Sequence, residues 1–214
     1  MEDELLTHRF KRRLWGDSIL CGRFVVIVAI FFGMVGCDKD VADRLGPQPI
    51  SLIDLDGQPY DLWQKPGEIT VVLFTRSDCP ISNRCAPEIR RLCQAYELRG
   101  VAFYLVYVDP GEQPEVIRRH LREYQYPCQG LRDPQHTLVT HCGATTTPEA
   151  VVFGQNRVMI YRGRVDDRYV DFGQARAEPT THDLADAIES TLLGKSVANP
   201  RTQAIGCLIA DLKD

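Results

Sequence analysis

The feature that most constrains this chain is a cysteine placed between an apolar stretch and an amphipathic one. Apart from Glu68, residues 68–74 are apolar or β-branched, which is typical of a strand buried on both faces of a sheet. Cys79 follows shortly afterwards and precedes Pro80, a residue favoured at the first position of a helix. The apolar residues beyond it recur at helical spacing: Ile89, Leu92, Cys93 and Tyr96. A thiol at a helix N-terminus has a lowered pKa, so the pattern predicts that Cys79 is reactive.

The rest of the chain alternates strand and helix signals. Residues around Asp56-Gly57 alternate in polarity and predict a hairpin, and residues 101–108 predict a second buried strand. Residues 149–153 and 157–163 predict an antiparallel hairpin. Helices are expected over 113–125, 134–141 and 181–194, the last with Thr181 as its N-cap. This order indicates an α/β fold, with a central mixed sheet flanked by helices.

Two motifs resemble those of the thioredoxin superfamily. One is "CPIS" after a buried strand, with Pro87 eight positions after Cys79, and the other is Thr147-Pro148 before an apolar strand. In that superfamily the first motif opens the active-site helix and the second is a cis-proline loop facing it. The stretch "SLIDLDGQPYDL" is similar to the opening hairpin of redoxin domains of the alkyl hydroperoxide reductase/thiol-specific antioxidant and TlpA-like groups. The last part of the chain resembles an exported bacterial subgroup. The resemblance implies a thioredoxin-like fold over about residues 50–193.

The second active-site cysteine of that superfamily is replaced here. It normally lies three residues after the first, and that position is Ser82, so this is a Cys-x-x-Ser site. Cys85 is a candidate substitute, but residues six apart on a continuous helix are separated by about 9 Å along its axis. A disulfide requires Cα atoms within about 7 Å of each other. Cys85 is therefore able to pair with Cys79 only if the first turn of the helix is unwound.

Two other cysteines are candidates for the thiol that resolves a mixed disulfide. Cys142 lies six residues before Pro148, in the loop that faces the active cysteine in the superfamily, and Cys207 lies on a tail beyond the last predicted helix. Cys93 is expected in the core, and Cys128, in "YPCQG", is expected in a turn without a role. Purely structural bridges among these cysteines remain an alternative.

The composition excludes some classes of function. A net charge of −4 without a basic patch gives no reason to expect nucleic acid binding. The chain has neither a glycine-rich phosphate loop nor a dinucleotide fingerprint, so no organic cofactor is expected. Eight cysteines in 214 residues is a high count and favours an oxidising compartment.

The N-terminus predicts export. Basic residues precede an uncharged run, 24–36, that is shorter than the roughly 20 residues of a membrane span and fits the apolar part of a secretory signal. The run ends in "MVGC", which resembles a bacterial lipobox and implies lipidation of Cys37; an uncleaved short anchor is the alternative. We expect a membrane-anchored protein facing the periplasm or the cell exterior. Its expected parts are a signal or anchor at 1–37, a linker at 38–49, a thioredoxin-like domain at 50–194 and a tail at 195–214.

The predicted activity is thiol–disulfide exchange through Cys79, with protein thiols or disulfides, or a thiol reductant, as partners. The resemblance implies that Thr147 and Pro148 present a backbone edge to the substrate. Glu149, next in sequence, is expected either to shuttle protons or to cap a strand end.

Three alternatives stay open. The first is a peroxiredoxin-like antioxidant peroxidase, although Arg76 stands where the peroxiredoxin signature has threonine, and the signature proline is missing. The second is copper handling, because soft thiolates and imidazole suit Cu(I). Its candidate ligands are Cys79, Cys85, His136 and His141. The third is a structural thioredoxin-like module without activity.

Overall fold

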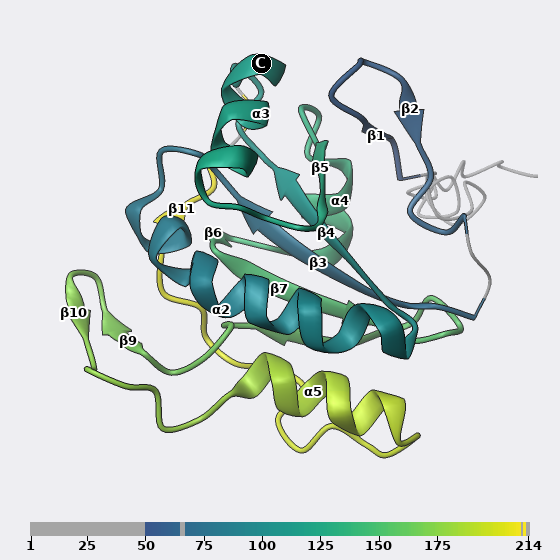
Figure 1. The fold of residues 1–214 in the computed structure, drawn as a ribbon, viewed down its shortest axis with the longest axis vertical. Helices are drawn as coiled ribbons and strands as arrows, with labels where there is room; N and C mark the ends of the chain where they lie inside the picture. Colours follow the sequence, from purple (N-terminus) through teal and green to yellow (C-terminus); the bar gives the residue numbers. More distant parts are fainter. Residues whose placement is uncertain (1–49, 65–66, 211, 213–214) are drawn as a thin grey trace, which may run out of the picture. The chain divides into compact units, whose positions relative to one another are not determined.

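Strand β3, Ile69–Thr75, lies in the interior of a mixed seven-stranded sheet (Figure 1). In this computed structural model, residues 50–64, 67–210 and 212 are described; the predicted signal, Cys37 and the linker lie outside them. The strand order is β2-β1-β5-β4-β3-β7-β8. The other six strands are β1 Leu52–Ile53, β2 Pro59–Tyr60, β4 Val101–Tyr107, β5 Gln129–Arg132, β7 Glu149–Phe153 and β8 Met159–Gly163.

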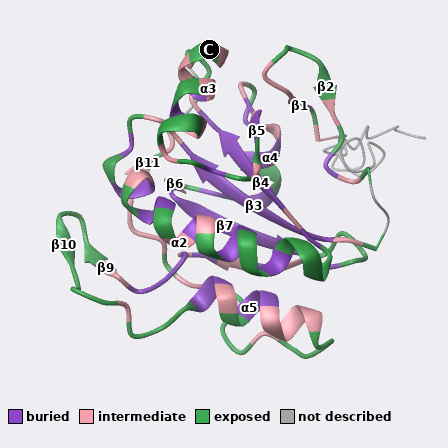
Figure 2. Ribbon diagram, in the orientation of Figure 1, coloured by how far each residue is buried: buried purple, intermediate pink, exposed green. Residues whose placement is uncertain are grey.

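The pairing of the strands confirms the predicted mixed sheet. β3 is parallel to β4 and antiparallel to β7, which continues into the antiparallel β7–β8 hairpin. β1 and β2 form the hairpin expected around Asp56-Gly57. All seven residues of β3 are buried, as expected of an apolar strand covered on both faces (Figure 2).

Helices cover both faces of this sheet. They are α2 Pro80–Tyr96, α3 Pro114–Glu123, α4 Thr137–Cys142 and α5 Asp183–Leu192. Alternate residues of β3 belong to two separate cores: Val71 and Leu73 pack with α2, α3 and α5, whereas Val72 and Phe74 pack with α4. A mixed sheet between helical layers is the thioredoxin-like architecture that the sequence predicted. The cysteines of α2 and α4 therefore lie on opposite faces of the sheet.

Several elements differ from the sequence prediction. The parallel strand β5 was not predicted, because its residues, "QGLR", lack an apolar run or a period-two pattern. Two small ladders were also missed: β9 Tyr169–Asp171 with β10 Gln174–Ala175, and β6 Thr146–Thr147 with β11 Cys207–Leu208. Helix α5 has His182 as its N-cap residue instead of Thr181, whose hydroxyl donates to the carboxylate of Asp183.

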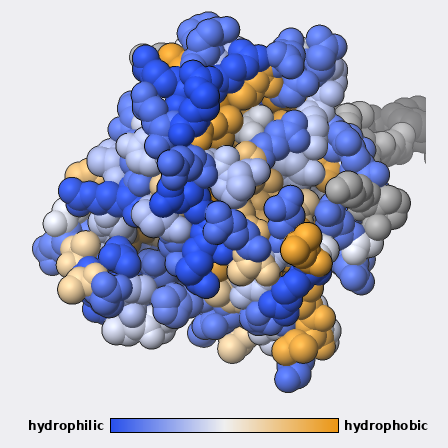
Figure 3. Space-filling model, in the orientation of Figure 1, coloured by the Kyte–Doolittle hydropathy of each residue, from blue (hydrophilic) through white to orange (hydrophobic). Residues whose placement is uncertain are grey.

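The surface carries no extended apolar face in the orientation of Figure 3, where hydrophilic residues predominate and apolar ones lie in separate small groups. Among the described residues, the largest exposed fraction of a big apolar side chain is that of Leu98, at 97%. No helix in this described part combines the length and the apolar character that a membrane crossing requires.

Candidate active site

Cys79 is the N-cap residue of α2, as the sequence predicted. Its backbone is extended, with φ −79° and ψ 111°, and Pro80 is the first helical residue. The backbone N–H of Ser82 donates to the Cys79 Sγ at 3.5 Å. The sulfur is thereby held against the free N–H groups of the first turn, where a thiolate is stabilised.

The loop before β7 faces this cysteine. The Thr147–Pro148 peptide bond is cis, as the resemblance implied. The Cys79 thiol donates a hydrogen bond to the Thr147 carbonyl oxygen at 3.1 Å. The structure therefore brings together Cys79, Ser82, Thr147 and Pro148.

The C-terminal tail covers the same loop. β11 pairs antiparallel with β6, which places Cys207 opposite Thr147. The Thr147 hydroxyl donates to the Cys207 carbonyl oxygen at 3.4 Å, and the Ile209 N–H donates to the Thr145 carbonyl oxygen at 2.9 Å. A Cβ atom at Gly206 would lie 2.0 Å from the Thr147 carbonyl oxygen, so this approach of the two backbones requires glycine.

The tail brings a second thiol to Cys79. Burial by itself raises the pKa of Cys79, but a hydrogen bond from the Cys207 thiol, together with hydrogen bonds from Ser82, outweighs it and brings that pKa to about 7. Burial and the same thiol–thiol contact raise the pKa of Cys207 to about 11. Of the two, Cys79 is therefore the thiol that ionises near neutral pH, whereas Cys207 stays protonated and acts as the donor.

Ser82 gives this site a further donor. Its side chain is buried, and its hydroxyl has no hydrogen-bond partner in the described part of the chain while Cys79 is a thiol. A buried hydroxyl without a partner is costly. Ionisation of Cys79 supplies an acceptor for it, which contributes to the lowered pKa of the cysteine.

The other two candidate resolving thiols are not brought to Cys79. Helix α2 is continuous from Pro80 through Pro87, so its first turn is not unwound. Cys85 is therefore separated from Cys79 along the helix axis. Burial and the charge of Asp166 raise the pKa of Cys85 to about 12. Cys142 packs in the core on the other face of the sheet, where burial raises its pKa to about 12.

The candidate copper ligands are also separated. His136 is buried beside α4, and its Nε2 atom lies 2.7 Å from the Val108 carbonyl oxygen. His141 is exposed and lies beside the ring of Phe153, with a centroid separation of 6.4 Å. Within the described ranges, no group of three or more His, Cys, Asp or Glu side chains is arranged to hold a metal ion. The proposed set of two cysteines and two histidines is therefore not assembled in this fold.

Glu149 caps the cis-proline loop. Its Oε2 atom accepts the N–H groups of Thr145 at 2.9 Å and Thr146 at 3.4 Å. Its Oε1 atom lies 3.2 Å from Nε of Arg162. The buried carboxylate thus holds the loop in place. Of the two roles expected for Glu149, this is the capping role.

A buried polar network fixes the segment that leads into Cys79, and the sequence reasoning missed it. The Asn83 amide donates to the Ser77 carbonyl oxygen at 2.9 Å, and its Oδ1 atom lies 2.7 Å from His120 Nε2. Because an amide oxygen only accepts, Nε2 carries the proton, and Nδ1 accepts from the Tyr107 hydroxyl at 2.8 Å. The available signal was a histidine on the apolar side of a predicted helix.

Comparisons with known proteins agree with this geometry. The sequence model of the AhpC/TSA family matches residues 47–162. The curated thiol-disulfide oxidoreductase ResA of Halalkalibacterium halodurans is 22% identical over 166 residues, which cover 75% of this chain and 93% of that protein. The family match ends at residue 162, before the tail that carries Cys207.

Two solved structures share the fold at full domain length. An uncharacterized conserved protein from Geobacillus kaustophilus has a TM-score of 0.69 and 26% identity, covering 78% of this chain and 91% of its own. A hypothetical protein from Sinorhizobium meliloti has a TM-score of 0.68 and 23% identity, covering 77% and 91%. Neither description names an activity, so these two comparisons support the fold alone.

Proposed function

Because this chain belongs to the AhpC/TSA family, we propose that it is a thiol–disulfide oxidoreductase whose two working thiols are Cys79 and Cys207. The observation that carries the proposal is geometric: β11 places Cys207 opposite Thr147, and the Thr147 carbonyl oxygen accepts from the Cys79 thiol at the N-cap of α2. The curated relative that is named a thiol-disulfide oxidoreductase supports the same reaction class.

In the reducing direction the reaction has two steps. The Cys79 thiolate attacks one sulfur of a partner disulfide, forms a mixed disulfide and expels the other partner sulfur as a thiolate. The Cys207 thiol then loses its proton to that departing thiolate or to solvent and attacks the Cys79 sulfur. A Cys79–Cys207 disulfide forms, and the second partner thiol leaves. A thiol reductant returns the chain to its dithiol form, and the same steps in reverse oxidise a partner dithiol.

The tail also controls access. Cys79 is only 1% exposed, whereas Cys207 is partly exposed. The backbone edge at Thr147 that was expected to receive a substrate segment is already paired with β11. A partner segment therefore takes the place of the tail on β6, and the tail returns to deliver Cys207 to the mixed disulfide.

Tryptic mapping of the oxidised full chain tests this assignment. Trypsin separates the relevant cysteines, because Cys79 lies in 77–84, Cys85 in 85–90 and Cys207 in 202–213. After oxidation with diamide we expect a linked 77–84/202–213 pair that dithiothreitol releases. A link from Cys79 to Cys85 would overturn the role of Cys207.

Trapping gives the functional readout. With a disulfide-containing peptide as substrate, Cys207→Ala is expected to accumulate the Cys79 mixed disulfide, and Cys79→Ala to form none. Cys142→Ala is the matched control, because it removes a buried thiol on the other face of the sheet. Rapid consumption of hydrogen peroxide without any exchange with the peptide would favour the peroxidase alternative instead.

We infer the cellular location from the N-terminal residues alone. The basic start, the apolar run 24–36 and Cys37 support an exported protein held at the membrane by a lipid, facing the periplasm or the cell exterior. Cys37→Ala is expected to move the protein from the membrane fraction to the soluble fraction. Retention of the variant in the membrane would favour an uncleaved anchor.

A further inference from the structure

A second pair of cysteines lies side by side near the opposite end of α2. Cys93 is in the last turns of that helix, Cys128 is in the connection 124–128 between α3 and β5, and the two side chains line the same cleft. Cys93 is buried and Cys128 is partly exposed, packed against the core to which Cys93 belongs. The sequence analysis had placed Cys93 in the core, as found, and had given Cys128 no role.

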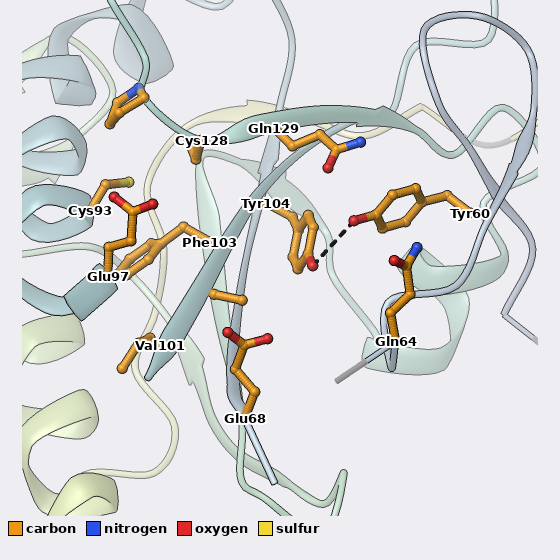
Figure 4. Close-up of a pocket in the computed structure, with 12 residues that line it drawn as sticks. Tyr60, Gln64, Glu68, Cys93, Glu97, Val101, Phe103, Tyr104, Cys128 and Gln129 are labelled. Carbon is orange, nitrogen blue, oxygen red and sulfur yellow. Dashed lines mark hydrogen bonds between the residues drawn. The ribbon is translucent and has the colours of Figure 1, made fainter. Parts of the chain in front are cut away.

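Both side chains line one cleft of about 280 Å³ (Figure 4). In this view the Cys93 sulfur points toward the Cys128 side chain, and the acidic group of Glu97 lies beside Cys93. The cleft continues between β4 and the β1–β2 hairpin, with Tyr60 and Tyr104 on its far side. Small reagents in solvent therefore have a path to the Cys128 sulfur.

We propose that Cys93 and Cys128 form a second, stability-conferring disulfide, independent of the Cys79 site. A low-molecular-weight disulfide is the oxidant. The Cys128 thiolate attacks it, forms a mixed disulfide and releases one small thiol. Cys93 then attacks the Cys128 sulfur, loses its proton to solvent and releases the second small thiol. Two protein thiols are oxidised and one small disulfide is reduced.

The surroundings of each sulfur suit these roles. Cys128 is the accessible sulfur, and it lies on irregular backbone that is able to move it toward Cys93. The interaction with Cys128, then burial and the charge of Glu97, raise the pKa of Cys93. Burial and Glu97 persist when a reductant is bonded to Cys128, so Cys93 is a poor leaving group and the disulfide resists reduction.

The disulfide links α2 covalently to the α3–β5 connection. A disulfide between segments distant in sequence restricts the unfolded chain and stabilises the fold. Neither Cys79 nor Cys207 contributes to this bond, and the failure of either proposal leaves the other intact.

The test uses the full chain carrying Cys79→Ser and Cys207→Ser, which prevents exchange through the first pair. The protein is incubated with oxidised glutathione at about pH 8.5, where more of the thiols are ionised. It is then quenched with acid, alkylated and digested with trypsin. Cys93 lies in the peptide 92–99 and Cys128 in 123–132. We expect these two peptides linked, and a melting temperature raised by roughly 5–10 °C over the reduced protein.

Two further variants complete the test. In the same background, Cys128→Ser is expected to lose both the link and the rise in melting temperature, whereas Cys142→Ser retains both. A glutathione adduct on Cys128 with Cys93 still free, or a link from either cysteine to another partner, would overturn the proposal.

Discussion

The two cysteine pairs place their buried sulfurs on the same helix but at opposite ends of it. Cys79 is the N-cap of α2, and Cys93 lies near its C-terminal end. Both are buried, with exposed fractions of 1% and 3%, and each lies beside a less buried cysteine, Cys207 in the short strand β11 and Cys128 in the α3–β5 connection. The helix dipole favours an anion at the N-terminus and disfavours one at the C-terminus. In the two proposals, position on one helix therefore decides which pair is reactive.

The acid–base properties follow this difference. At the N-terminal end, hydrogen bonds outweigh burial and bring the pKa of Cys79 to about 7. At the other end, the contact with Cys128, burial and Glu97 all raise the pKa of Cys93. A reductant attacks the more exposed sulfur of each disulfide, Cys207 or Cys128, and expels the buried one. The bond with the better leaving group breaks faster, so one pair suits turnover and the other suits structure.

The largest expected difference between the two regions is in activity. Cys79→Ala is expected to reduce exchange with a disulfide peptide to the uncatalysed background, because it removes the nucleophile. Cys128→Ala is expected to leave the rate within about twofold, because the side chain lies outside the reacting group. Release of free thiols over time measures both. Equal losses in the two variants would show that the pairs are not functionally distinct.

The next largest difference is expected in the rates at which the two disulfides are reduced. In the fully oxidised chain, dithiothreitol at neutral pH is expected to break the Cys79–Cys207 bond at least about tenfold faster than the Cys93–Cys128 bond. The order follows from the leaving groups after attack on Cys207 or Cys128: Ser82 and the N-terminus of α2 still stabilise the Cys79 thiolate, whereas burial and Glu97 still disfavour that of Cys93. Acid quenching and tryptic mapping at successive times follow each bond separately. Reduction in the opposite order would contradict the leaving-group argument.

Much of the fold and the position of Cys79 at a helix N-terminus were predictable from the sequence. The buried strand, Cys79-Pro80 and the apolar spacing beyond it fixed the N-terminus of α2 to the residue. These are local signals, because strand burial, proline at the first helical position and helical periodicity depend on neighbours in sequence. The same kind of signal predicted the β1–β2 and β7–β8 hairpins.

The partners of both buried cysteines were beyond local reasoning. Cys207 was one of several candidate resolving thiols, because nothing near it indicates that β11 pairs with β6. Its strand is two residues long and partly exposed, and it exists only through contacts with a distant loop. Cys128 was assigned to a turn without a role, since its contact with Cys93 depends on the packing of α2 against the α3–β5 connection. Such contacts are tertiary, and a local pattern does not encode them.

The next prediction concerns the hydrogen bond that makes the first pair reactive. Cys207→Ala removes the donor to Cys79, so the pKa of Cys79 is expected to rise by about 1–2 units from its value of about 7. Cys207→Ser keeps a donor and is expected to stay near the wild-type value. The measurement is the pH midpoint of iodoacetamide alkylation of Cys79, followed on peptide 77–84.

In that experiment the pH midpoint of alkylation reports the pKa of Cys79, whereas the plateau rate at high pH does not. Loss of Cys207 also loosens the tail and exposes the Cys79 sulfur, which changes the maximal rate in either variant. At pH values between the two midpoints, a smaller fraction of Cys79 is ionised in the alanine variant than in the serine variant. Well above both midpoints, the ionised fractions of the two variants converge. An unchanged midpoint in Cys207→Ala would show that Ser82 and the helix N-terminus alone set the pKa.

The smallest effect is expected from the network that supports the first pair alone. Burial lowers the pKa of His120, so the residue stays neutral in the folded protein, whereas in the unfolded chain it binds a proton below about pH 6.5. The unfolded state therefore takes up protons that the folded state does not, and stability is lost as the pH falls below that value. His120→Gln is expected to lower the free energy of unfolding at pH 7 by about 1 kcal/mol and to flatten its decline below pH 6.5.

Urea unfolding at several pH values measures this effect, with the exposed His141→Gln as the control expected to leave the free energy of unfolding nearly unchanged. Because Asn83 links His120 to the Ser77 carbonyl just before Cys79, the variant is also expected to change the alkylation of Cys79. Labelling of Cys128 is expected to change less, because the hydrogen bond of His120 to α2 is made at Asn83, near the N-terminal end, whereas only ring contacts with Tyr124 and Tyr126 reach the connection that carries Cys128. Equal changes at both cysteines would mean that His120 supports the whole helix and that the two ends of α2 are not separately controlled.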